Sequence, residues 1–175
     1  RDVVFPDGHL NKDVVGISPR EVGAMAGIDV PESARLIMLP AKGAGEDDIL
    51  AREKLCPVIA ILPYETFEDA VQKAKANLLV EGAGHSAALH SHDEANIRHA
   101  GLELPISRLV VNQASSLTAG GSLTNGFAPT TTLGCGSWGG NSISENLDYK
   151  HLMNVSRIGK VIENKKVPTD EEIWA

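Results

Sequence analysis

Short apolar runs alternate along the first two thirds of the chain with segments whose apolar positions repeat at helical spacing. The most apolar run is residues 57–62 (Pro-Val-Ile-Ala-Ile-Leu), which predicts a buried strand. Shorter runs predict three further strands, at residues 34–39, 86–89 and 108–112. Because these strands are apolar on both faces and alternate with helices, we expect an α/β fold with a mostly parallel sheet and flanking helices.

Three helices are expected from their start signals, over residues 18–26, 66–79 and 91–101. Ser18-Pro19-Arg20-Glu21 fits a capping box with proline in the first turn, and Gly27 suits the end of that helix. Thr66 is the expected cap of the second helix. Ser91 and Glu94 form the corresponding pair for the third.

The last third of the chain has little periodicity. Residues 113–141 carry no convincing element, and so long an irregular stretch is uncommon in a compact domain unless it serves a site. The segment 131–146 contains four glycines, one cysteine and one tryptophan. Residues 151–161 predict a final strand, and 163–175 predict an exposed tail that offers Ile173 and Trp174 for docking. We therefore divide the chain into a main part, 1–150, and a terminal part, 151–175.

Composition restricts the classes of partner. The chain has 175 residues and a net charge of −7, with no basic block, so nucleic acid is not an expected partner. No apolar run approaches the roughly 20 residues that span a bilayer, so no membrane association is expected either. Two cysteines make no disulfide framework, which favours a cytoplasmic protein with free thiols.

The two cysteines have different expected roles. Cys135 lies between two glycines, where free backbone amides favour a thiolate nucleophile, as in a small hydrolase. The alternative is a small loop residue packed under Trp138. Cys56 precedes the most apolar strand and is expected to be a small buried hydrophobic residue.

Histidine and glutamate side chains supply further candidates. His85, His90, His92 and His99 suggest a metal site, but no carboxylate or thiol is spaced to complete a ligand set. His85 follows the glycine turn at 82–84, where a ligand has room to approach the backbone; the alternative is a hydrogen-bonded structural histidine. Glu53 lies just before a strand, where its carboxylate is suited to accept hydrogen bonds from a vicinal diol such as a ribose. The alternative is a surface carboxylate that binds no ligand.

Several of these segments together resemble the CoA-acylating branch of the aldehyde dehydrogenase superfamily. Glu53-Lys54-Leu55-Cys56-Pro57-Val58 is similar to the Glu-x-Phe-x-Pro-Val segment of that superfamily. Gly84-His85-Ser86 and the block 133–146 resemble bifunctional aldehyde-alcohol dehydrogenases and their acylating relatives. Residues 150–158 and 171–174 look most similar to acylating succinate-semialdehyde dehydrogenases. The resemblance covers nearly the whole chain.

The resemblance implies an enzyme that converts an aldehyde, CoA and NAD or NADP into an acyl-CoA and the reduced nucleotide. Its nucleophilic cysteine and its dinucleotide-binding domain precede the Glu53 segment in such proteins and are expected upstream of this chain. The chain would then be a C-terminal part of the catalytic domain, inactive alone, with a small aldehyde, CoA and further copies of itself as partners. The alternative is an inert binding or oligomerisation module.

The same resemblance assigns individual residues. Glu53 would hold the hydroxyls of the nicotinamide ribose, and Leu55 occupies the place of an aromatic residue beside the nicotinamide ring. His85 and the segment 112–121 are expected along the aldehyde or CoA channel. The polar candidates within that segment are Asn112, Ser115, Ser116 and Thr118. The hydroxyls of Ser115, Ser116 and Thr118 are expected to bind an acidic substrate tail. Glu53 and the turn around Trp138 are expected to line one crevice.

Overall fold

The alternation of strands and helices is confirmed in the computed structural model, which describes residues 1–161, 163 and 166–175. The strands are β1 (Ile37–Pro40), β2 (Val58–Ile61), β3 (Gly84–Leu89) and β4 (Ile106–Val111). The helices are α1 (Pro19–Met25), α2 (Phe67–Val80), α3 (Glu94–Glu103), α4 (Ser115–Thr118) and α5 (Asp170–Trp174). Short 3-10 turns occur at Pro6–Gly8, Lys12–Val14, Gly45–Asp47, Ile49–Ala51, Ser137–Gly139 and Tyr149–Leu152. None of the described helices is long and apolar enough to cross a membrane.

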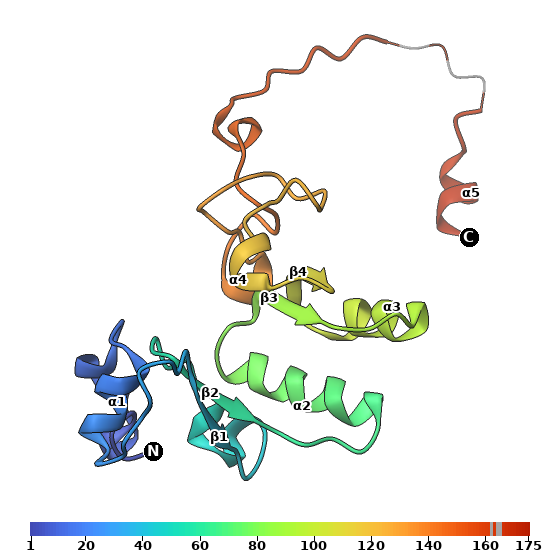
Figure 1. Ribbon diagram of the computed structural model, residues 1–175. Helices are drawn as coiled ribbons and strands as arrows, with labels where there is room; N and C mark the ends of the chain where they lie inside the picture. The colour runs from blue at the N-terminus through green and yellow to red at the C-terminus, as the bar shows by residue number, and fades with distance from the viewer. Residues whose placement is uncertain (162, 164–165) are drawn as a thin grey trace.

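The strands form two parallel pairs. In the first pair Ile37 of β1 lies opposite Val58 of β2, and in the second Gly84 of β3 lies opposite Ile106 of β4. Within the described ranges no ladder joins β2 to β3, which are connected through α2 (Figure 1). The expectation of strands covered on both faces is wrong for the first pair, because Met38 and Ile59 are 57% and 42% exposed.

Each pair of strands has its own apolar cluster. The first cluster contains Val4, Phe5, Val14, Val22, Leu50 and Val58. The second contains Val71, Ala100, Leu104 and Ile106, and packs α2 and α3 against β4. The first dozen residues thus contribute two buried side chains, those of Val4 and Phe5. Their apolar positions are too few and too irregularly spaced to reveal this in the sequence.

The predicted helix starts are confirmed at two positions and wrong at one. The Ser18 hydroxyl accepts the N–H of Glu21, whose carboxylate accepts the N–H of Ser18, so the capping box is complete. Thr66 caps α2 as expected. The third helix begins after Asp93, whose carboxylate accepts the N–H groups of the first turn, while Ser91 supports Asp93 from outside the helix.

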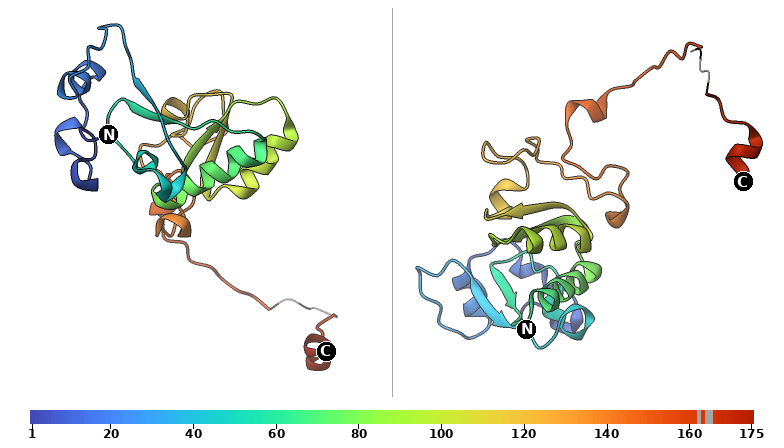
Figure 2. Two further views of the ribbon diagram at one scale, coloured as in Figure 1. Left: turned by 90° about the horizontal axis from the view of Figure 1, so that it is seen from below. Right: turned by 90° about the vertical axis from the view of Figure 1, so that its right-hand side faces the viewer.

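The predicted strand at 151–161 is absent. Residues Tyr149–Leu152 form a 3-10 turn, and the chain then runs away from the folded part with Val155 and Ile158 62% and 88% exposed (Figures 1 and 2). A strand needs a neighbour for its backbone groups, and none lies beside this segment among the described residues. The rest of the tail is exposed, as predicted, and ends in α5; residues 164 and 165 of it lie outside the described residues.

A buried carboxylate organises the N-terminal part. Asp48 is 4% exposed, accepts the N–H groups of Lys42 (2.7 Å) and Leu50 (3.0 Å), and binds the Arg1 guanidinium. Burial alone would raise the pKa of the Asp48 carboxyl, but these donors together hold that pKa below its usual value. The pKa of the Asp48 carboxyl is lower in the folded chain than in the unfolded chain. The stabilisation of the fold by the ionised carboxylate is therefore fully present above the unfolded-state pKa, and it is lost as the pH falls through the folded-state pKa.

We predict that Asp48→Asn lowers the free energy of unfolding at pH 7 by about 1–3 kcal/mol, because the amide brings N–H groups toward buried donors. Between pH 7 and the acid range the variant should also lose less stability than the original chain. Urea unfolding at a series of pH values measures both effects, with the exposed Asp2→Asn as the matched control. Parallel pH profiles for the original chain and Asp48→Asn would contradict the prediction.

Candidate functional site

The glycine turn before β3 is packed against the glycine-rich loop of this same chain. Gly84 has a φ of +83°, and a side chain there would collide with the backbone carbonyl of Cys135. Only glycine allows so close an approach of the two backbones. The space that the sequence suggested for a ligand at this turn is therefore occupied by the loop, which fixes the loop beside His85.

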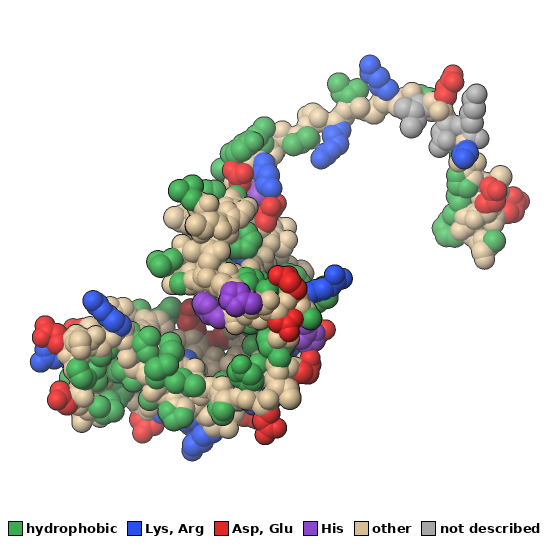
Figure 3. Space-filling view, turned by 45° about the vertical axis from the view of Figure 1, so that its right-hand side comes forward, with side chains coloured by type: hydrophobic (Ala, Val, Ile, Leu, Met, Phe, Trp, Pro, Cys, Tyr) green, Lys and Arg blue, Asp and Glu red, His purple; other side chains and the backbone are tan. Residues whose placement is uncertain are grey.

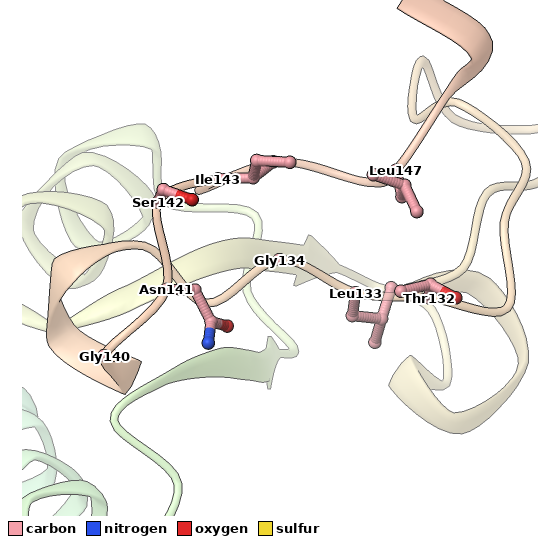
Figure 4. Close-up of a pocket in the computed structure, with 8 residues that line it drawn as sticks. All are labelled: Thr132, Leu133, Gly134, Gly140, Asn141, Ser142, Ile143 and Leu147. Carbon is pink, nitrogen blue, oxygen red and sulfur yellow. The ribbon is translucent and has the colours of Figure 1, made fainter. Parts of the chain in front are cut away.

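The glycine-rich loop also folds closely on itself. The N–H of Gly134 donates to the carbonyl of Glu145 (3.0 Å), and the N–H of Gly136 donates to that of Ile143 (2.8 Å). Between its two limbs lies a cavity of about 410 Å³ (Figure 4). Its lining residues are Thr132, Leu133, Gly134, Gly140, Asn141, Ser142, Ile143 and Leu147. Since none of these side chains titrates near neutral pH, this cavity offers no acid–base chemistry.

One buried guanidinium holds this loop to the strands. Arg108 of β4 is 2% exposed and donates from Nε to the Ser86 hydroxyl at 3.0 Å. Its Nη1 donates to the carbonyl of Gly134 (2.8 Å), and its Nη2 donates to that of His85 (2.9 Å). The sequence analysis missed this residue. The available signal was a single charged residue in the otherwise apolar run of β4.

Asn146 extends the same network into the irregular segment. Its Oδ1 accepts a longer bond from Arg108 (3.4 Å), and its Nδ2 donates to the carbonyls of Ala119 (3.0 Å) and Ala128 (2.8 Å). Asn146 is 5% exposed, so these partners replace water for every polar atom of its side chain. The hydrogen bonds of Arg108 and Asn146 thereby hold residues 119–146 in place, although this segment has little regular secondary structure.

Two adjoining cavities lie beside this network. The smaller cavity has a volume of about 350 Å³, and its lining includes Ala51, Arg52, Glu53 and Ser86. The larger cavity has a volume of about 490 Å³, and its lining includes Cys135, Trp138 and Asn141. Both are lined by Leu78, Glu81, Gly82 and His85. Glu53 and Trp138 thus line two different cavities that share part of their walls, and the expectation that they line one crevice stays a prediction. Their roles toward a cofactor stay predictions.

The environment of Glu53 favours hydrogen-bond acceptance. Its backbone N–H donates to the Glu81 carboxylate (2.6 Å), while its own carboxylate has no partner among the described residues. The neighbouring Lys54 turns away and donates to the carbonyls of Leu50 (2.6 Å) and Arg52 (2.8 Å). Burial lowers the pKa of the Lys54 ammonium, although nearby Glu81 opposes this shift. The smaller cavity thus presents two carboxylates, Glu53 and Glu81, to any hydroxyl-bearing ligand.

The other predicted site residues lie outside these two cavities. Leu55 is 52% exposed and has a φ of +47°, a conformation that costs free energy for a residue with a side chain. Asn112 exchanges two hydrogen bonds with the backbone of Ser91 (3.0 and 2.8 Å) and so supports the β3–α3 loop. The Thr118 hydroxyl donates to the carbonyl of Ala114, the residue before α4, and Ser115 and Ser116 lie in the same helix. Contact of these residues with a substrate stays a prediction.

The cysteines and histidines show little sign of independent chemistry. The Cys135 thiol is half-buried and lies 3.9 Å from the carbonyl of Leu133; the part of the chain that the structure describes places no base in hydrogen-bonding contact with it. Burial raises the pKa of the Cys56 thiol, which packs against the first apolar cluster. Among residues 1–161, 163 and 166–175, no three histidine, cysteine or acidic side chains are grouped to hold a metal ion.

Comparison with known proteins confirms the resemblance seen in the sequence. Succinate-semialdehyde dehydrogenase (acetylating) of Clostridium kluyveri is 58% identical over 174 residues, which are 99% of this chain and 38% of that protein. Aldehyde-alcohol dehydrogenase 2 of Entamoeba histolytica is 41% identical over 152 residues, covering 87% of this chain and 18% of that protein. No protein-family model matches the chain.

The fold agrees with solved structures of the same group. The crystal structure of an acetylating aldehyde dehydrogenase from Geobacillus thermoglucosidasius matches with a TM-score of 0.85 and 31% identity. The match covers 97% of this chain and 37% of that one. The chain therefore spans less than two fifths of the length of the relatives it matches.

We predict that Arg108→Met lowers the free energy of unfolding by about 2–4 kcal/mol, because it leaves several buried carbonyl groups without a donor. The exposed Arg98→Met, on α3, should change it by less than about 0.5 kcal/mol. Urea unfolding measures both variants. The Cys135 thiol should also react faster with an alkylating reagent in Arg108→Met, in a Cys56→Ser background. Equal stability and equal labelling of the two arginine variants would contradict the assigned role.

Proposed function

We propose that this chain, homologous to part of the acetylating aldehyde dehydrogenases, belongs to an enzyme that converts an aldehyde and CoA into an acyl-CoA with reduction of NAD or NADP. The observation that carries the proposal is the 58% identity with the Clostridium kluyveri enzyme over 99% of the chain. So high an identity over nearly the whole chain favours a shared function for the shared part.

The residues present fit a nicotinamide nucleotide. The Glu53 carboxylate lies at a 350 Å³ cavity and has no partner among the described side chains, so its oxygens are free to accept ribose hydroxyls. The nucleotide, when bound, would accept a hydride from the substrate. In this proposal Glu53 orients the ribose, and the loop fixed by Arg108 lines the neighbouring cavity.

The substrate that we propose is a short aldehyde, with succinate semialdehyde favoured by the name of the Clostridium kluyveri relative. A carboxylate at the far end of that substrate suits hydroxyl donors such as Ser115, Ser116 and Thr118 of α4. The thiol that attacks the aldehyde is proposed to belong to a part of the enzyme outside this chain, because the described residues give Cys135 no base.

A second candidate function, assembly, is favoured by the tail. Hydrophobic side chains lie along the tail among charged ones (Figure 3), and Val155, Ile158 and Trp174 are at least 62% exposed. Exposed apolar side chains in such number commonly mark an interface. We propose that the tail contributes to a homo-oligomer, and that the protein works in the cytoplasm.

The proposal predicts that the 175-residue chain alone is inactive and that a chimera is active. The chimera replaces the matching 174 residues of the Clostridium kluyveri enzyme with this chain. We expect reduction of NAD or NADP that requires both succinate semialdehyde and CoA. A folded chimera without that activity, beside an active parent enzyme, would count against the proposal, as would activity of the isolated chain.

Within the chimera, Glu53→Gln should raise the KM for the nucleotide and lower kcat, because an amide binds a ribose diol less strongly than a carboxylate. The expected loss in kcat/KM is about 10- to 100-fold, the value of one or two charged hydrogen bonds. Steady-state kinetics at varied nucleotide concentration measures it. Glu65→Gln, another exposed glutamate, is the matched control; an effect no larger than that of Glu65→Gln would remove Glu53 from the site.

A further inference from the structure

We infer that Glu81 is a positioning residue for Glu53, because its carboxylate holds the backbone from which the Glu53 side chain reaches the smaller cavity. This role rests on the proposed function, in which Glu53 binds the nucleotide, and it concerns a residue to which that function assigns no part. Glu81 acts through the main chain of Glu53, so the role requires no contact between Glu81 and the nucleotide.

Glu81 projects from the end of an anchored helix. It follows the last residue of α2 in an extended conformation, with a φ of −152° and a ψ of 137°. Its own N–H donates to the carbonyl of Asn77 at 3.3 Å, which keeps its backbone attached to the helix. Val71 of α2 is 3% exposed within the second apolar cluster. The packing of α2 therefore determines where the Glu81 carboxylate lies.

Two side chains of this helix bind the two ends of one segment, residues 45–53. The side-chain oxygen of Asn77 accepts the N–H of Gly45 at 2.7 Å, and the Glu81 carboxylate accepts the N–H of Glu53 at 2.6 Å. Asn77 and Glu81 are four residues apart, a spacing that makes side chains neighbours at a helix surface. Segment 45–53 is thus attached to the end of α2 at both of its termini.

This attachment joins parts of the chain that pack separately. Leu50 of segment 45–53 is 1% exposed in the first apolar cluster, whereas α2 packs in the second. Within the described ranges no strand ladder connects the two pairs of strands. Glu81 supplies the contact at the Glu53 end of the segment, so it fixes Glu53 relative to His85 and Ser86, which line the same cavity.

The backbone just before Glu53 is held as well. The Lys54 ammonium donates to the carbonyls of Leu50 and Arg52 at 2.6 and 2.8 Å. With Glu81 accepting the next N–H along the chain, only the side-chain torsions of Glu53 have to become ordered when a ligand binds. Loss of the Glu81 acceptor would release the backbone at Glu53 and add the entropy of that segment to the cost of binding.

The contact is tested in the full chain by amide hydrogen exchange of Glu53, measured by NMR. The Glu53 N–H should exchange roughly 3- to 10-fold faster in Glu81→Ala, which is the value of one hydrogen bond. Glu81→Gln should stay near the original rate, because its amide oxygen still accepts the N–H. The exposed Glu65→Ala is the matched control and should change nothing. An unchanged rate in Glu81→Ala would overturn the assignment.

The positioning role is tested by nucleotide binding to the chimera, measured by calorimetry so that no turnover is needed. Glu81→Ala should weaken the binding of NAD or NADP roughly 3- to 10-fold, and Glu81→Gln should restore most of the affinity. In a Glu53→Gln background the same Glu81→Ala change should cost less than about 2-fold, because Glu81 acts through Glu53. An equal loss in both backgrounds would overturn the positioning role.

Asn77→Ala separates positioning from simple attachment of the segment, because it removes the contact at the distant end. It should lower the resistance to urea about as much as Glu81→Ala does, yet weaken nucleotide binding by less than about 2-fold. An equal loss of binding in Asn77→Ala and Glu81→Ala would also overturn the role. A folded chimera that shows the expected binding losses but no activity would count against the proposed function alone.

Discussion

The buried Arg108 guanidinium is the interaction on which the site depends. A charge 2% exposed needs partners for all its donors, and Arg108 finds them in carbonyl groups of the loop and of β3 together with the side chains of Ser86 and Asn146. These partners come from segments more than 20 residues away on either side. Because leaving any of them unpaired in the interior is costly, the guanidinium fixes where the glycine-rich loop lies relative to the strands.

Close backbone contacts at two glycines, together with the hydrogen bonds of Arg108, hold the glycine-rich loop in place. Gly84 admits the carbonyl of Cys135, and Gly134 fits between the carbonyls of Ile143 and Glu145. Gly134 therefore serves packing within the chain, while the loop also encloses one cavity between its limbs and lines a second one beside β3. His85 lines both the cavity at Glu53 and the cavity at Trp138.

Large apolar side chains are exposed in two parts of the chain. Met38 of β1 and Ile59 of β2 are exposed, and so are Val155 and Ile158 of the tail. Each of the two strand pairs has its own small apolar cluster. The chain spans less than two fifths of the length of the relatives it matches.

The sequence by itself determined the local elements: the capping box of Ser18 and Glu21, the cap at Thr66, and the order of strands and helices between residues 57 and 112. It also determined the resemblance, through the Glu53 segment and the block 133–146. Only the tertiary structure decided that the strands form two pairs, that 151–161 is no strand, and that Arg108 and Asn146 hold the loop. Caps and periodicity act within a few residues of each other, whereas strand pairing and the partners of a buried charge depend on groups that are distant in sequence.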